Sequence, residues 1–154
     1  MSRHLIVVPD ARQMPDEYTE IINELPADLG LRPRIAPWAG SVEQGATAVE
    51  ALLDKHELRR VVLLGCGVGA TVALRIAAAQ PGRVSHLVLA FPAPLRRRLM
   101  FRKSDHQSVS TPTLTITGSD APAAAEHATI PGATRRTFTT HPREVAELLS
   151  VFLR

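Results

Sequence analysis

The sequence has a single cysteine, Cys66, among its 154 residues. One cysteine excludes an internal disulfide and any cysteine-based zinc cluster. Long apolar runs are scarce as well: the N-terminal run from Leu5 to Val8 is far too short for a signal peptide or a membrane span. We therefore expect a cytoplasmic protein with no membrane span, no metal site and no cofactor.

Charge is also limited, at 21% of residues with a net charge of +3, against 45% hydrophobic residues. These fractions are ordinary for a soluble globular chain. A chain of this length is large enough to build a real core, so we expect one domain over residues 1–154.

The stretch from residue 60 to 91 indicates a parallel βαβ unit. Val61 to Leu64 is a short apolar run typical of a buried strand. Alternate glycines over 65–69 allow a sharp turn at low conformational cost. Ala70 to Ala79 favours a helix, Gln80 to Gly82 ends it, and Val84 to Phe91 predicts the next strand.

The rest of the chain continues this alternation. The apolar patterns predict further strands at 5–8, 34–36, 113–117 and 135–139, and further helices at 15–25, 41–56, 121–127 and from 142 to the end. Ser41 and Gln44 have the spacing of a capping box. The implied fold class is α/β, a doubly wound and mostly parallel sheet with helices on both faces.

The glycine turn resembles the nucleophile elbow of the α/β-hydrolase family, which reads Gly-x-nucleophile-x-Gly after a buried strand. Gly65 and Gly69 match the outer glycines, whereas Gly67 stands at the nucleophile position. The resemblance covers about residues 4 to 154. It implies that Pro9 and Asp10 lie in the loop that supplies an oxyanion donor, and that residues 92–110 are a short stub where many members insert a lid domain.

The resemblance also indicates where a catalytic triad would lie. Cys66 precedes the nucleophile position by one residue and is either a displaced nucleophile or a small core residue. Asp120 is one residue short of the usual acid position and either orients a histidine or caps a helix. His141 lies at the edge of the last helix, as a base or as a solvated helix-start histidine. The triad is therefore predicted to be degenerate.

The chain suggests a ligand pocket even without a nucleophile. Asp10 follows a strand at the carboxyl edge of the sheet, where open α/β sheets bind ligands. Amides at the start of the helix after Gly67 can hold an anion or an oxyanion. The predicted pocket residues are Pro9, Asp10, Gly67 and Val68. The turn lacks the Gly-x-Gly-x-x-Gly spacing and the following acidic residue of dinucleotide-binding proteins.

A basic run lies within the lid stub and consists of Arg96, Arg97, Arg98, Arg102 and Lys103. It is either a solvated surface or a docking patch for something acidic, such as a carrier protein, a phosphate-bearing ligand or an anionic surface. Nucleic acid is not expected, because no aromatic stacking platform accompanies the charge.

Three functions follow. The favoured one is a non-hydrolytic member of the hydrolase fold that binds a small molecule or acts as a cofactor-free lyase, isomerase or cyclase. The alternatives are an unusual esterase or thioesterase using Cys66 or an activated water, and a non-catalytic subunit that docks an acidic partner. The sequence leaves the oligomeric state open.

Overall fold

A parallel β-sheet organises the part of the chain that the computed structural model describes, which is residues 3–10, 15–91, 111–117, 126–130 and 140–154. Its strand order is β2-β1-β3-β4-β5-β6, and every neighbouring pair is parallel. The strands are β1 (Arg3–Val8), β2 (Leu31–Ile35), β3 (Val61–Cys66), β4 (Val84–Ala90), β5 (Thr113–Thr117) and β6 (Glu126–Thr129). The order reverses between β1 and β3, and parallel α/β sheets bind ligands at such a switch point.

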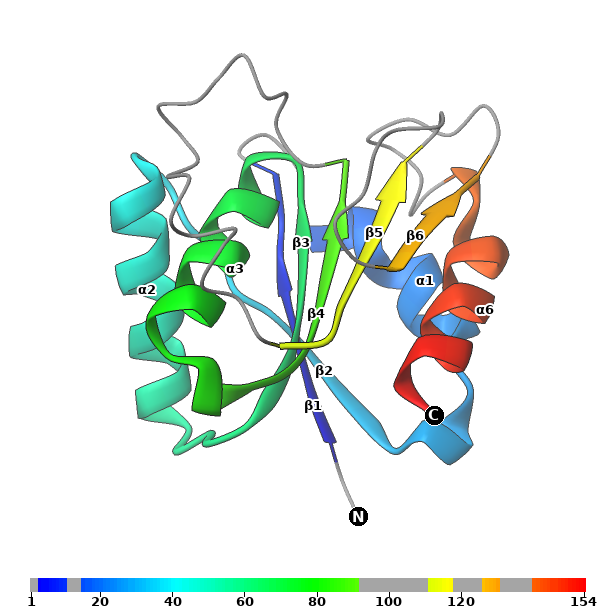
Figure 1. Cartoon of the computed structure of the whole chain (residues 1–154), viewed down its shortest axis with the longest axis horizontal. Helices are drawn as coiled ribbons and strands as arrows, with labels where there is room; N and C mark the ends of the chain where they lie inside the picture. The colour runs from blue at the N-terminus through cyan, green and yellow to red at the C-terminus, as the bar shows by residue number, and fades with distance from the viewer. Residues whose placement is uncertain (1–2, 11–14, 92–110, 118–125, 131–139) are drawn as a thin grey trace.

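Helices cover both faces of this sheet (Figure 1). The α-helices are α1 (Thr19–Glu24), α2 (Val42–Lys55), α3 (Val68–Ala79) and α6 (Pro142–Leu153), and the short 3-10 helices are η1 (Pro15–Tyr18), η2 (Ala27–Leu29) and η3 (Pro81–Arg83). Two buried clusters result, one between the sheet and α2 with α3, the other between the sheet and α1 with α6. The expected α/β fold class is confirmed.

Local sequence signals account for most element boundaries. Ser41 accepts a hydrogen bond from the Gln44 amide, and the Gln44 side chain returns one to the Ser41 amide, so the predicted capping box begins α2. Pro142 begins α6, whose buried side includes Val145 and Leu149. Strand β3 is buried along its whole length, as expected for a central parallel strand.

Two expectations differ from the structure. β2 begins at Leu31 rather than at residue 34, and runs through Pro33. β2 is an edge strand, where the missing proline N–H is tolerated. The helix expected over 121–127 is wrong at its end, because Glu126 opens β6 and pairs in register with Leu114 of β5. The strand expected at 135–139 lies outside the described residues.

No helix in the described part of the chain is long and apolar enough to cross a membrane. Among those same residues, no group of three or more His, Cys, Asp and Glu side chains could hold a metal ion.

Candidate functional site

A sharp turn joins β3 to α3 at the carboxyl edge of the sheet. Gly67 forms the turn with φ 59° and ψ −122°, in a region that side-chain-bearing residues rarely adopt. Its amide donates to the Ala90 carbonyl of the neighbouring strand at 2.9 Å, and its carbonyl accepts from the Ala70 amide at 3.1 Å. These bonds hold the turn between β4 and the first turn of α3.

The outer glycines allow close approach of the backbone. A Cβ on Gly65 would lie 2.5 Å from the Gly69 carbonyl oxygen and 2.6 Å from the Ala70 Cα. A Cβ on Gly69 would press on the carbonyl oxygens of Val8 and Pro9. A larger residue at position 65 would therefore push α3 away from β3, and one at position 69 would push α3 away from the end of β1.

The carboxylate of Asp10 lies directly over Gly67. Asp10 Oδ1 accepts a hydrogen bond from the Val68 amide at 3.0 Å, at the N-terminus of α3. A Cβ built on Gly67 would lie 2.5 Å from Asp10 Oδ2 and 2.7 Å from Oδ1. The carboxylate thus takes both the space where a side chain at position 67 would start and the amide of the following residue.

Trp38 fixes the loop that carries Asp10. The indole Nε1 of Trp38 donates to the Pro9 carbonyl at 2.8 Å. Trp38 in turn packs tightly on α2, because a Cβ on Gly45 would lie 3.0 Å from its ring atom Cδ2. Trp38 is therefore a positioning residue for Asp10, a role that its position between Pro37 and Ala39 does not reveal.

Cys66 and Tyr18 form a buried pair beneath the turn. Both side chains are 0% exposed, and they hydrogen-bond to each other. Burial raises the pKa of Tyr18 far above its ordinary value of 10.0, with further contributions from Cys66, Asp10 and Glu17. Tyr18 is therefore a neutral hydrogen-bonding group at the base of the site, whereas its helical spacing in the sequence indicated only a core residue.

The other predicted catalytic residues are placed as follows. His141 precedes α6, partly exposed, with its Nδ1 2.7 Å from the Thr140 hydroxyl. Asp120 lies outside the described residues, as do Arg96, Arg97, Arg98, Arg102 and Lys103. The structure thus brings together Pro9, Asp10, Gly67 and Val68, with Cys66 below them.

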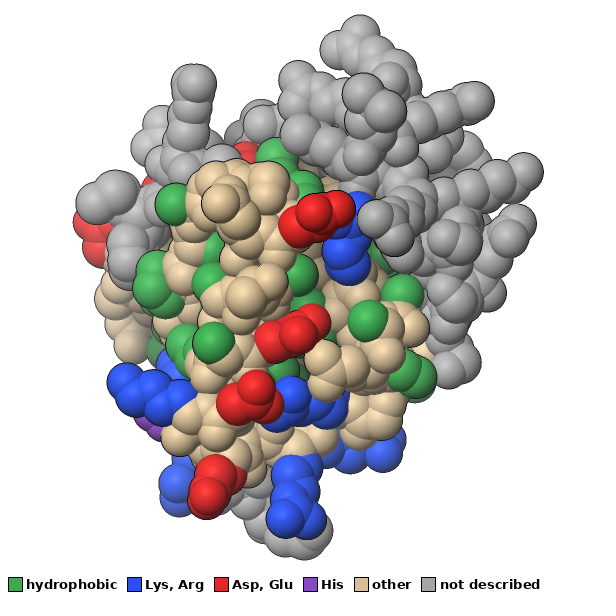
Figure 2. Space-filling view, turned by 90° about the vertical axis from the view of Figure 1, so that its left-hand side faces the viewer, with side chains coloured by type: hydrophobic (Ala, Val, Ile, Leu, Met, Phe, Trp, Pro, Cys, Tyr) green, Lys and Arg blue, Asp and Glu red, His purple; other side chains and the backbone are tan. Residues whose placement is uncertain are grey.

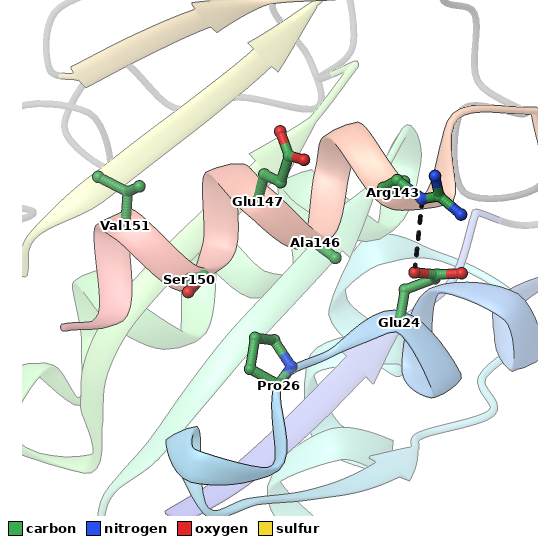
Figure 3. A pocket seen from close by; sticks show the side chains of 7 residues that line it. All are labelled: Glu24, Pro26, Arg143, Ala146, Glu147, Ser150 and Val151. Carbon is green, nitrogen blue, oxygen red and sulfur yellow. Dashed lines mark ion pairs between the residues drawn. The ribbon is translucent and has the colours of Figure 1, made fainter.

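A shallow groove elsewhere on the molecule is separate from this site. It has a volume of about 490 Å³ and is lined by Glu24, Pro26, Arg143, Ala146, Glu147, Ser150 and Val151. Figure 3 shows these side chains on α6, at the end of α1 and on the segment that follows it, with the Glu24–Arg143 ion pair across one end. The Arg143 Nε to Glu24 Oε2 distance is 3.9 Å. No residue of the turn lines this groove, so it does not extend the site around Asp10.

Residues 38–100, which contain the turn, match the Ndr family. The lipase LipV of Mycobacterium tuberculosis (strain ATCC 25618 / H37Rv) is 41% identical over 64 residues. That match covers 42% of this chain and 24% of the lipase, so the chain matches about a quarter of this relative's length.

Solved structures are similar over a much larger part of the chain. A predicted CIB-like hydrolase from Thermoplasma acidophilum has a TM-score of 0.83 at 15% identity, covering 98% of this chain and 86% of that one. MGS-MChE2, an alpha/beta hydrolase enzyme from a lagoon-sediment metagenome of Mar Chica, Morocco, has a TM-score of 0.80 at 16% identity, with 99% and 90% covered. At these identities the likeness concerns the arrangement of the backbone.

Proposed function

The chain has the α/β-hydrolase fold, and on that premise we propose that it is a non-hydrolytic member whose reacting group is the Asp10 carboxylate. It binds a small molecule at the carboxyl edge of the sheet. Asp10 accepts a proton from that molecule, as in a cofactor-free lyase or isomerase. The observation that carries the proposal is the contact of Asp10 with Gly67 and the Val68 amide.

The covalent mechanism of a serine hydrolase lacks its nucleophile at position 67. That route needs a nucleophile on the turn, and Gly67 has no side chain. It also needs an amide after the nucleophile to stabilise the oxyanion, and the Val68 amide already donates to Asp10. A carbonyl oxygen would have to displace a carboxylate from this amide before acyl transfer could begin.

The same contacts suit proton transfer. The Val68 amide holds the carboxylate in place at the N-terminus of the twelve-residue helix α3. The bond to Oδ1 and the Trp38 bond to Pro9 fix its orientation. A positioned carboxylate within reach of a substrate C–H or O–H is the basic requirement for general base catalysis.

Cys66 is disfavoured as a nucleophile by its surroundings. Its side chain is 0% exposed and hydrogen-bonds to Tyr18, which is equally buried. A reactive cysteine needs access to its substrate and an electropositive neighbourhood that favours the thiolate. The pair fits a structural role under the turn.

The test combines hydrolysis and proton exchange. Wild type, Asp10→Asn and Cys66→Ala are assayed with p-nitrophenyl acetate and butyrate, and by NMR for deuterium uptake from D2O into a panel of enolisable ketones and β-keto acids. Asparagine keeps an oxygen acceptor for the Val68 amide but removes the base. We expect exchange in wild type and Cys66→Ala, and at least about a hundredfold loss in Asp10→Asn.

Ester turnover by wild type that survives in Asp10→Asn would contradict the proposal. Turnover that disappears only in Cys66→Ala would establish the cysteine as the nucleophile. Cooperative thermal unfolding of each of the three proteins well above the assay temperature serves as the control for folding.

A further inference from the structure

Five basic side chains gather where the edge strand β2 meets the end of α2, and we call them the basic corner. They are His4, Arg32, Arg34, Lys55 and His56. Arg32 and Arg34 are two residues apart on one strand and so share a face. Their register partners on β1 are His4 and Ile6, and Ile6 belongs to the core under α2. The arginines therefore face the side of the sheet that α2 covers.

The end of α2 joins this group through a direct contact. Arg34 Nη1 donates to His56 Nε2 at 3.2 Å. Because arginine can only donate, His56 accepts in its neutral form. Partial loss of hydration, followed by the positive charges of Arg34, Lys55 and His4, lowers the pKa of His56. Each of these effects disfavours protonation of His56, and none of them comes from a carboxylate.

Four arginines elsewhere in the described structure have acidic partners of a kind that the corner lacks. Arg75, Arg83, Arg143 and Arg154 form ion pairs with Glu43, Asp54, Glu24 and Asp28. Within the described residues, Arg32, Arg34 and Lys55 form no ion pair with a carboxylate. Figure 2 shows Lys and Arg side chains at the lower end of the α2 side of the molecule, with Asp and Glu side chains among them.

From this charge arrangement we infer that the basic corner is a docking surface for an acidic segment of another protein. Arg32, Arg34, Lys55 and His56 are exposed. None of them lines the groove at α6, or a second groove beside η3 that is lined by Asp54, Glu57, Leu58, Arg59 and Arg83. An open surface of long cationic side chains fits a row of carboxylates better than a small ligand, which concave sites enclose.

Two features of the basic corner argue against a partner that adds a β-strand and against nucleic acid. Pro33 lies between the two arginines and removes a backbone donor from the edge strand, so side chains rather than strand addition make the contact. The corner contains no aromatic side chain, and stacking platforms are typical of single-stranded nucleic acid binding.

The surface lies at the amino ends of the strands, opposite the edge that carries Asp10, so docking leaves that edge open.

The probe is a fluorescent deca-glutamate peptide, titrated into the full chain at low salt. NMR mapping of the ¹⁵N-labelled protein is expected to locate the largest amide shifts at Arg32, at Arg34 and over residues 54–57. The double variant Arg32→Ser with Arg34→Ser should weaken binding about fivefold or more, since each exposed charge pair contributes modestly. Raising the salt should weaken wild-type binding strongly.

The matched control is Arg143→Ser with Arg154→Ser, which removes the same net charge from exposed positions on and after α6. It should change the affinity less than twofold. Equal losses in the two double variants, or the largest shifts outside the corner, would overturn the inference. A duplex DNA of equal charge that binds the same amides more tightly than the peptide would also overturn it.

Discussion

The Asp10 carboxylate lies over the Cα of Gly67, in the space that any side chain at that position would need. The two residues belong to loops that follow β1 and β3, which are neighbours in the sheet. The turn therefore has the backbone of an elbow, and a carboxylate from the adjacent loop occupies the side-chain space at its tip. Position 67 is therefore expected to tolerate a side chain only when Asp10 is replaced by a smaller residue.

The first prediction concerns this coupling. Gly67→Ser places a side chain at φ 59° and against Asp10, and should lower the free energy of unfolding by about 3 kcal/mol or more. In an Asp10→Gly background the steric conflict is gone, and the serine should cost only the backbone strain of about 1–2 kcal/mol. Urea denaturation of the four proteins measures the difference. Identical costs in both backgrounds would show that the two positions are independent.

A second prediction uses two glycines in different surroundings. Gly69→Ala presses a methyl group on the backbone of Val8 and Pro9 and should destabilise the protein by about 2–3 kcal/mol. Gly82→Ala is the control, because a Cβ there has nothing within 4 Å. It should change stability by less than about 0.5 kcal/mol. Thermal unfolding of both variants tests this, and a larger loss for Gly82→Ala would contradict the packing at Gly69.

The third prediction concerns high pH. Tyr18 has a raised pKa in the folded state, so the unfolded state loses its proton first once the pH passes 10.0. The stability that Tyr18 contributes is complete below pH 10.0 and falls as the pH rises further. Tyr18 is the chain's sole tyrosine, so phenolate absorbance reports it alone. The absorbance should appear together with unfolding followed by circular dichroism.

The control for that experiment is Tyr18→Phe, which removes the titrating group. It should lower stability at pH 7 by about 0.5–1.5 kcal/mol through loss of the bond to Cys66. It should also flatten the decline of stability above pH 10.0. Phenolate formation in a protein that remains folded would contradict the burial of Tyr18.

A fourth prediction concerns access to Cys66. Its side chain is 0% exposed, so a thiol-reactive probe should modify the native protein at least about a hundredfold more slowly than the protein in denaturant. Tyr18→Phe should speed the reaction only as far as it raises the population of open states. Fast modification of native wild type would show that the thiol is accessible, and would favour the esterase alternative.

Local signals in the sequence were sufficient to predict the elements whose boundaries are determined by their own residues. β5 has the predicted bounds Thr113–Thr117, and α2 begins at the predicted capping box. In both cases, the residues that determine the boundary lie within the element itself. The parallel order of the sheet followed from alternation of strands and helices, which physical rules restrict to few topologies.

Elements that depend on distant partners were harder to predict. β6 begins with Glu126 and His127, and pairing with β5 makes it a strand where the alanine-rich sequence before it favoured a helix. The bond between Asp10 and Val68 joins residues 58 positions apart, and only the strand order brings them together. The sequence indicated Asp10 and Gly67 as separate candidates, but not that one fills the space of the other.

The contact between β1 and the end of α6 also has a consequence for folding during synthesis. Arg3 Nη1 donates to the Leu153 carbonyl at 2.7 Å, across 150 residues, and Leu5 and Leu149 share one buried cluster. During synthesis the apolar side of β1 has to wait until α6 leaves the ribosome before that cluster can close. Until then, this surface is open to chaperones, and truncations that remove α6 should yield insoluble chains rather than a smaller folded protein.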